Sequence, residues 1–115
     1  MKYLVKFTPV LAFFFSSVLL AHVQLQNSEP TNNAMLASSP ERLSLTFGND
    51  VRLLKVTFSD SKGEEVNFGF KPVKNSGDNF SWGLPQLATG NYVVEMIFFG
   101  EDGHKMKERI NFMIH

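Results

Sequence analysis

Alternation of apolar and polar residues over short runs is the feature that most limits what this chain can fold into. In the clearest run, Leu43, Leu45 and Phe47 alternate with polar residues. A period of two is that of a β-strand, in which successive side chains point to opposite faces. A helical period of about 3.6 residues is hardly seen after the N-terminal segment. We therefore predict a β-protein.

About seven such runs follow one another at a spacing of roughly ten residues. We expect strands over 23–27, 42–47, 51–58, 65–70, 80–84, 92–99 and 107–114. Between them we expect a loop at 28–33, a turn or bulge at 48–50 and a polar loop at 71–78, because these segments are rich in turn-forming residues. The pattern predicts an all-β fold: a small Greek-key antiparallel β-sandwich of the immunoglobulin-like kind.

Large aromatic side chains fall at positions that the alternation directs inward, and such rings fill the gap between two sheets well. The predicted inward set is Phe47, Phe58, Phe68, Phe70, Phe80, Trp82, Tyr92 and Phe112.

The N-terminal segment is typical of an export signal. Lys2 and Lys6 form a positive start, and an apolar stretch over 10–20 leads to Ala21, a suitable last residue before cleavage. The stretch is short for a retained membrane anchor, which needs about 20 apolar residues. We expect residues 1–21 to be a signal peptide and 22–115 to be one domain in the periplasm.

Charge and cysteine content exclude several classes of function. The chain has 11 basic and 11 acidic residues, so removing Lys2 and Lys6 leaves 9 basic against 11 acidic. Nucleic-acid binders usually carry a basic excess, so no nucleic-acid partner is expected. The chain has no cysteine, so a metal site would have to use histidine, carboxylate, methionine or backbone nitrogen.

Two of the three histidines can act together. Cleavage after Ala21 would make His22 the first residue, where its free amino group and ring nitrogen can chelate one ion. His104 follows Asp102 by two positions, and side chains two apart on an extended segment project to the same side. Two imidazoles and one amine suit Cu(II), which prefers tetragonal nitrogen and oxygen ligands. His115, the last residue of the sequence, is set aside as incidental.

The order of short motifs over the whole mature chain resembles the periplasmic copper-resistance protein CopC and its relatives. It begins with His22, Leu25, Ser28 and Pro30 and continues with Pro40, Leu43, Leu45 and Phe47. It ends with Leu87, Gly90 and Tyr92, then Asp102 and His104, then Phe112.

The resemblance implies a small exported sandwich that binds one Cu(II) through a histidine brace. His22 would supply its amino and ring nitrogens, His104 a second ring nitrogen, and Asp102 a nearby carboxylate or weak axial ligand. The protein would buffer or deliver copper without catalytic turnover. Its partners would be the copper ion and a membrane copper transporter or another periplasmic copper protein, and we expect a monomer.

The sequence departs from the family pattern in two places. Asn49 stands where many relatives have an acidic residue, and Asp50 could replace it only if a bulge shifts the register. The segment 62–79 has no methionine or histidine, so the methionine-rich Cu(I) site of some relatives is not expected there. Met35, Met96, Met106 and Met113 are scattered and are interpreted as core or surface residues.

Two other functions stay open. A metal-free envelope interaction module would retain the fold with a degenerate copper site, and Asn49 is the residue that favours it. A histidine-brace oxidative enzyme would also have a terminal histidine on a sandwich, but it needs a broad substrate face for which this chain has little room.

Overall fold

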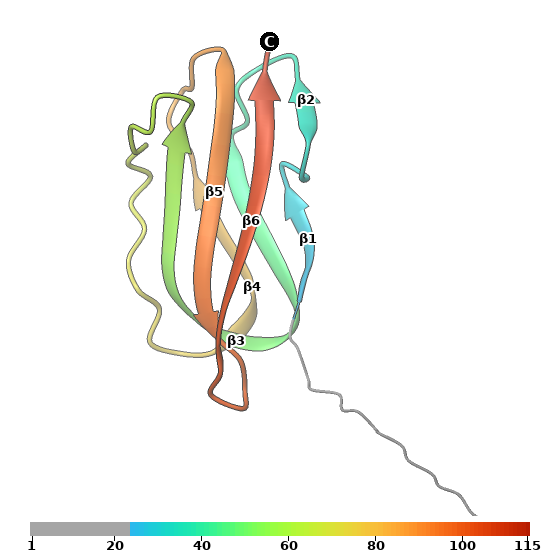
Figure 1. Cartoon of the computed structure of the whole chain (residues 1–115), viewed down its shortest axis with the longest axis vertical. Coiled ribbons are helices and arrows are strands. Elements are labelled where there is room, and N and C mark those ends of the chain that lie inside the picture. The colour runs from blue at the N-terminus through green and yellow to red at the C-terminus, as the bar shows by residue number, and fades with distance from the viewer. Residues whose placement is uncertain (1–23) are drawn as a thin grey trace, which may run out of the picture.

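The computed structural model describes residues 24–115, so the expected signal peptide 1–21 and His22 lie outside the described residues (Figure 1). The strands are β1 (Leu25–Glu29), β2 (Ala34–Leu36), β3 (Arg42–Asp60), β4 (Gly77–Gly83), β5 (Gly90–Phe99) and β6 (Lys105–Ile114). Residues 24–115 form no helix, and none that could cross a membrane is found among them. The all-β prediction is confirmed.

β3 belongs to both layers of the sandwich. Its first half pairs antiparallel with β1 and β4, and its second half pairs antiparallel with β5. β5 pairs antiparallel with β6, and β6 pairs parallel with the short edge strand β2. Figure 1 shows β3 running down one layer, bending at the lower end of the view and returning in the other layer. One continuous strand thus takes the place of the two predicted at 42–47 and 51–58.

The bend of β3 coincides with the predicted turn or bulge at 48–50. The register with β4 shifts between Thr46 and Val51, as expected of a bulged strand. Gly48, Asn49 and Asp50 are all exposed there, between the buried Phe47 and Val51. The turn-forming residues at 48–50 therefore correctly indicated a bend. The strand continues through this bend and does not end there.

The prediction of a strand over 65–70 is wrong. This segment makes only an isolated bridge between Ser59 and Glu65. Gly69 adopts a φ of 81°, in the left-handed region, and its N–H donates to the Asn67 side chain. Val66, Phe68 and Phe70 still pack against the core. The alternation of apolar residues in this segment therefore correctly indicated which side chains face the core, but it did not indicate a hydrogen-bonded strand.

Two boundaries near the N-terminus also differ from expectation. Residues 28 and 29, predicted as loop, end β1 by pairing with Leu45 and Ser44. Residues 34–36, which the sequence left as an inward-tucked segment, form β2 against Phe112, Met113 and Ile114. A three-residue strand is too short to show a period, and tertiary pairing alone reveals it.

The core lies between the two layers and follows the predicted alternation. The buried residues are Leu43, Leu45, Phe47, Val51, Leu53, Val56, Phe58, Leu87, Tyr92, Val94, Met96, Phe98, Ile110, Phe112 and Ile114. Four of the predicted inward aromatics, Phe68, Phe70, Phe80 and Trp82, are only half-buried and pack against its side. Phe58 contacts the rings of Tyr92 and Phe112 edge-on, each at 5.8 Å between centroids.

Tyr92 ties the start of β5 to the connector that precedes it. Its ring is buried, and its hydroxyl donates a 2.6 Å hydrogen bond to the carbonyl of Ala88. This is the geometry of the tyrosine corner found in Greek-key sandwiches. This hydrogen bond fixes the position of the connector relative to the start of β5.

We predict that Tyr92→Phe lowers the free energy of unfolding by about 1 kcal/mol, because it deletes one buried hydrogen-bond donor while keeping the ring. Urea unfolding followed by tryptophan fluorescence measures the change. Ser44→Ala is the control: it removes a hydroxyl pair with Ser81 on the exposed face, and we expect less than about 0.5 kcal/mol. If the two substitutions lowered the free energy of unfolding equally, the hydrogen bond from Tyr92 would have no special stabilising role.

Candidate metal site at the β5–β6 turn

The β5–β6 connection is a tight turn that carries two of the predicted site residues. The N–H of Gly100 donates to the carbonyl of His104, and the N–H of Gly103 donates to the carbonyl of Gly100, both at 3.0 Å. Gly103 has a φ of 85°, a conformation that favours glycine. The backbone of the turn is therefore held by its own hydrogen bonds at the tip of the hairpin.

Asp102 and His104 contact each other directly. Asp102 Oδ2 lies 2.8 Å from His104 Nδ1, and Asp102 Oδ1 accepts a 3.0 Å hydrogen bond from the His104 backbone N–H. We expected the two side chains to meet through extended alternation. They meet instead across a turn, because the carboxylate caps the N–H two residues ahead.

The hydrogen bond determines which ring nitrogen is available. An ionised carboxylate can only accept, so Nδ1 carries the proton that points at Asp102. The neutral ring then has its lone pair on Nε2. The side chain of His104 is 79% exposed, so Nε2 is open to a ligand. This is the arrangement in which a carboxylate orients a metal-binding histidine.

The same contact changes the acidity of Asp102. The hydrogen bond with the His104 ring, and then the one from the His104 backbone, lower the pKa of the Asp102 carboxyl below its ordinary value of 3.8. Hydrogen bonds to the charged form of an acid favour that form. Asp102 is thus ionised throughout the neutral range.

The start of β1 lies at the same end of the sandwich as this turn. Leu25 pairs with Phe47, and the N–H of Gly48 donates to the carbonyl of Gln24 at 2.9 Å, just before the bend of β3. Just after the bend, Arg52 pairs with Phe99, the last residue of β5. Figure 1 shows the start of β1, the bend and the β5–β6 turn together at the lower end of the view.

Asn49 and Asp50 lie on the bend, exposed, at this same end. The register shift that would allow Asp50 to replace the family's acidic residue is present in β3.

Within residues 24–115, no three histidine, aspartate or glutamate side chains gather closely enough to hold a metal. Asp102 and His104 supply one imidazole and one carboxylate, and His22 falls outside the described part. Sequence reasoning named this pair but could not tell that the carboxylate engages Nδ1, since that depends on the conformation of the turn.

The fold and this turn define a class: small immunoglobulin-like β-sandwiches with an Asp–His pair on an end hairpin. A family model described as the CopC domain matches residues 25–115. The chain therefore belongs to the CopC domain family. No curated relative matches the chain at a significant level.

Solved structures agree with this assignment. CopC from Methylosinus trichosporium OB3b is 28% identical, with a TM-score of 0.68 over 81% of this chain and 93% of that one. PcoC, a methionine-rich copper resistance protein from Escherichia coli, is 21% identical, with a TM-score of 0.62 over 83% and 100%. Murine CRIg shares only the fold, at 10% identity and a TM-score of 0.51 over 83% and 98%.

We predict that His104→Ala raises the pKa of Asp102 toward 3.8, because it removes the ring hydrogen bond, the largest cause of the lowered value. In the wild type, the stabilisation from ionised Asp102 is complete above 3.8 and is lost as the pH falls through the lower folded-state pKa. Carbon-detected NMR of the side-chain carboxyl, in metal-free protein, measures both values. His115→Ala is the matched control and should leave the pKa of Asp102 unchanged. If the pKa of Asp102 were also unchanged in His104→Ala, the hydrogen bond with the His104 ring would not be the cause of the lowered pKa.

Proposed function

We propose that the mature protein binds one Cu(II) ion through His22 and His104 and buffers or delivers it in the periplasm. His22 supplies its α-amino and ring nitrogens, and His104 supplies Nε2. The observation that carries the proposal is the 2.8 Å contact between Asp102 Oδ2 and His104 Nδ1, which in the neutral ring places the lone pair on Nε2 of a side chain that is 79% exposed.

The reach of the N-terminus is compatible with this arrangement. Two residues separate His22 from Leu25, the first residue of β1. A chain spans at most about 3.5 Å per residue, so His22 can extend about 10 Å from Leu25. Leu25 pairs with Phe47 beside the bend of β3, so this reach starts at the end of the sandwich where the β5–β6 turn lies.

The donor set fits Cu(II) better than other divalent ions. Three nitrogens in a T, from one amine and two imidazoles, match the tetragonal preference of Cu(II), which also heads the affinity order for such sites. Asp102 uses both of its oxygens on His104. We therefore assign it first to orienting the ring and only then to a weak axial contact. The α-amino group, with a pKa near ~8, must lose its proton to bind, so affinity falls in mildly acidic solution.

The relatives support the same function. The PcoC structure is described as that of a copper resistance protein, and the more similar match bears the family's own name. A carrier needs no substrate face, and the site proposed here sits on an exposed hairpin tip where a transporter can approach it. We expect export through residues 1–21, with cleavage after Ala21.

We predict that the processed protein, starting at His22, binds one equivalent of Cu(II) with a tetragonal electron paramagnetic resonance spectrum and nitrogen couplings. His104→Ala should weaken binding by about a hundredfold, because one of three strong ligands is lost. Retaining one residue before His22 should weaken it similarly, because the amine becomes an amide.

His115→Ala is the control, since His115 lies at the far end of β6 from the turn (Figure 1). Equal affinity of the extended and processed forms would rule out the brace. No binding by the processed form would favour the metal-free interaction module instead.

Asp102→Asn gives a sharper test of the orienting role. The amide NH₂ would donate to Nδ1 and move the ring proton to Nε2, the nitrogen that the proposal gives to copper. We expect Cu(II) affinity to fall by about 10–100-fold, the usual cost of losing such a partner. Asp78→Asn, an exposed carboxylate on β4, is the control. An unchanged affinity in Asp102→Asn would mean that the carboxylate does not set the tautomer.

A further inference from the structure

Positive charge is concentrated on one half of the outer face of the second layer. In two successive rows of the sheet, a cation on β3 and a cation on β6 flank an apolar residue of β5. The rows are Arg52–Phe99–Lys105 and Lys55–Ile97–Lys107. All four cations are exposed, whereas the two apolar residues are half-buried. Phe98, between the two rows on β5, is fully buried, so the rows themselves face outward.

The charge of these four cations is not balanced within the described part of the chain. In the next row, Arg109 Nε lies 3.6 Å from Glu95 Oε2, so that cation has a partner. The other ion pair of residues 24–115 is the one between Asp102 and His104. The chain as a whole has 11 basic and 11 acidic residues, so the gathering of cations on this face does not follow from composition.

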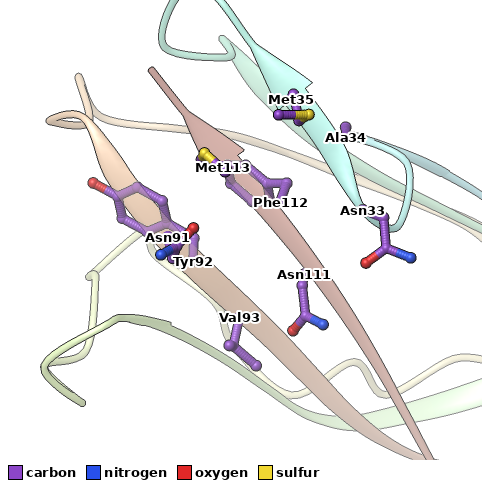
Figure 2. A pocket seen from close by; sticks show the side chains of 9 residues that line it. All are labelled: Asn33, Ala34, Met35, Asn91, Tyr92, Val93, Asn111, Phe112 and Met113. Carbon is purple, nitrogen blue, oxygen red and sulfur yellow. The ribbon is translucent and has the colours of Figure 1, made fainter.

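The other half of the same face is uncharged. Figure 2 shows a hollow of about 370 Å³ there, and the polar side chains that line it are the neutral amides of Asn33, Asn91 and Asn111. Met35 and Met113, which are register partners on β2 and β6, also line it. The cations therefore lie at one end of the face, the end where β5 finishes and β6 begins.

The size of the cationic half fits a short segment of chain. Neighbouring strands are about 4.8 Å apart and each residue rises about 3.4 Å, so the two columns of cations are about 10 Å apart and extend about 7 Å along the strands. A standard interface between folded proteins needs about 800 Å² on each side. Carboxylates form charge-assisted hydrogen bonds with lysine and arginine, and Ile97 and Phe99 offer an apolar contact between the columns.

The face is less suited to an anionic membrane. An interfacial anchor buries apolar side chains at the boundary between headgroups and acyl chains. Here the Arg52 guanidinium lies 5.3 Å from the centroid of the Phe99 ring and covers it. Ile97 is half-buried between the longer side chains of Lys55 and Lys107. Neither apolar side chain stands clear of its cations, so an acidic protein segment is the better occupant.

We propose that these four cations and the two apolar residues between them form a docking surface for an acidic segment of a partner protein. We call this surface the cationic face. It adjoins the turn that carries Asp102 and His104, so a partner bound there lies beside the candidate metal site. Docking itself does not require copper, and only its use in copper transfer rests on the proposed function.

The test titrates metal-free, nitrogen-15-labelled protein with a short glutamate peptide that has a pair of leucines at its centre. We expect the largest amide shifts at 52–55, 97–99 and 105–107, and little change at Asn33 and Asn111 in the hollow. Added salt should weaken binding, because exposed charges are screened. Since no metal is present, the result is independent of the Cu(II) proposal.

Substitutions separate a docking surface from an effect of net charge. Lys107→Glu should weaken peptide binding by about fivefold, because one ion pair is replaced by a repulsion. Lys62→Glu is the matched control: it makes the same change of charge in the turn after β3 and should leave the affinity unchanged. Both lysines are exposed, so both variants should fold, and circular dichroism checks this.

Vesicles of phosphatidylglycerol test the alternative occupant by co-sedimentation. Peptide binding that depends on Lys107 and not on Lys62 supports the proposal. Failure to bind the peptide, with or without binding to the vesicles, would overturn it. So would equal losses in the two variants, or amide shifts spread over the whole surface.

Discussion

The passage of β3 through both layers is the constraint on which the rest of the structure depends. Its first half pairs with β1 and β4, and its second half with β5. The same strand thereby contributes buried residues to both sides of one core, from Leu43 to Phe58. Because its bend at 48–50 lies between Phe47, paired with Leu25, and Arg52, paired with Phe99, the start of β1 and the end of β5 lie at the same end of the sandwich.

This geometry separates the buried core, which stabilises the fold, from the exposed β5–β6 turn, which carries the candidate metal-binding residues. The interior is apolar and aromatic, whereas Asp102 and His104 lie on an exposed hairpin tip that adds nothing to the core.

Much of the fold, and the meeting of Asp102 with His104, was predictable from the sequence. The alternation of Leu43, Leu45 and Phe47, and of Ile110, Phe112 and Ile114, identified residues that are all buried. It failed at 65–70, where Val66, Phe68 and Phe70 pack on the core without a ladder. A period of two indicates which side of the chain is apolar. It does not indicate whether a neighbouring backbone is close enough to form hydrogen bonds with it.

The sequence by itself determined that the domain is all-β and that Asp102 stands two positions before His104, because both follow from the order of residues along the chain. Only the tertiary structure decided that the carboxylate engages Nδ1 and that Met35 lies beside Met113. The first depends on the dihedral angles of a glycine turn. The second depends on a parallel contact between a three-residue strand and the far end of the chain, and long-range pairing of this kind leaves no local pattern to read.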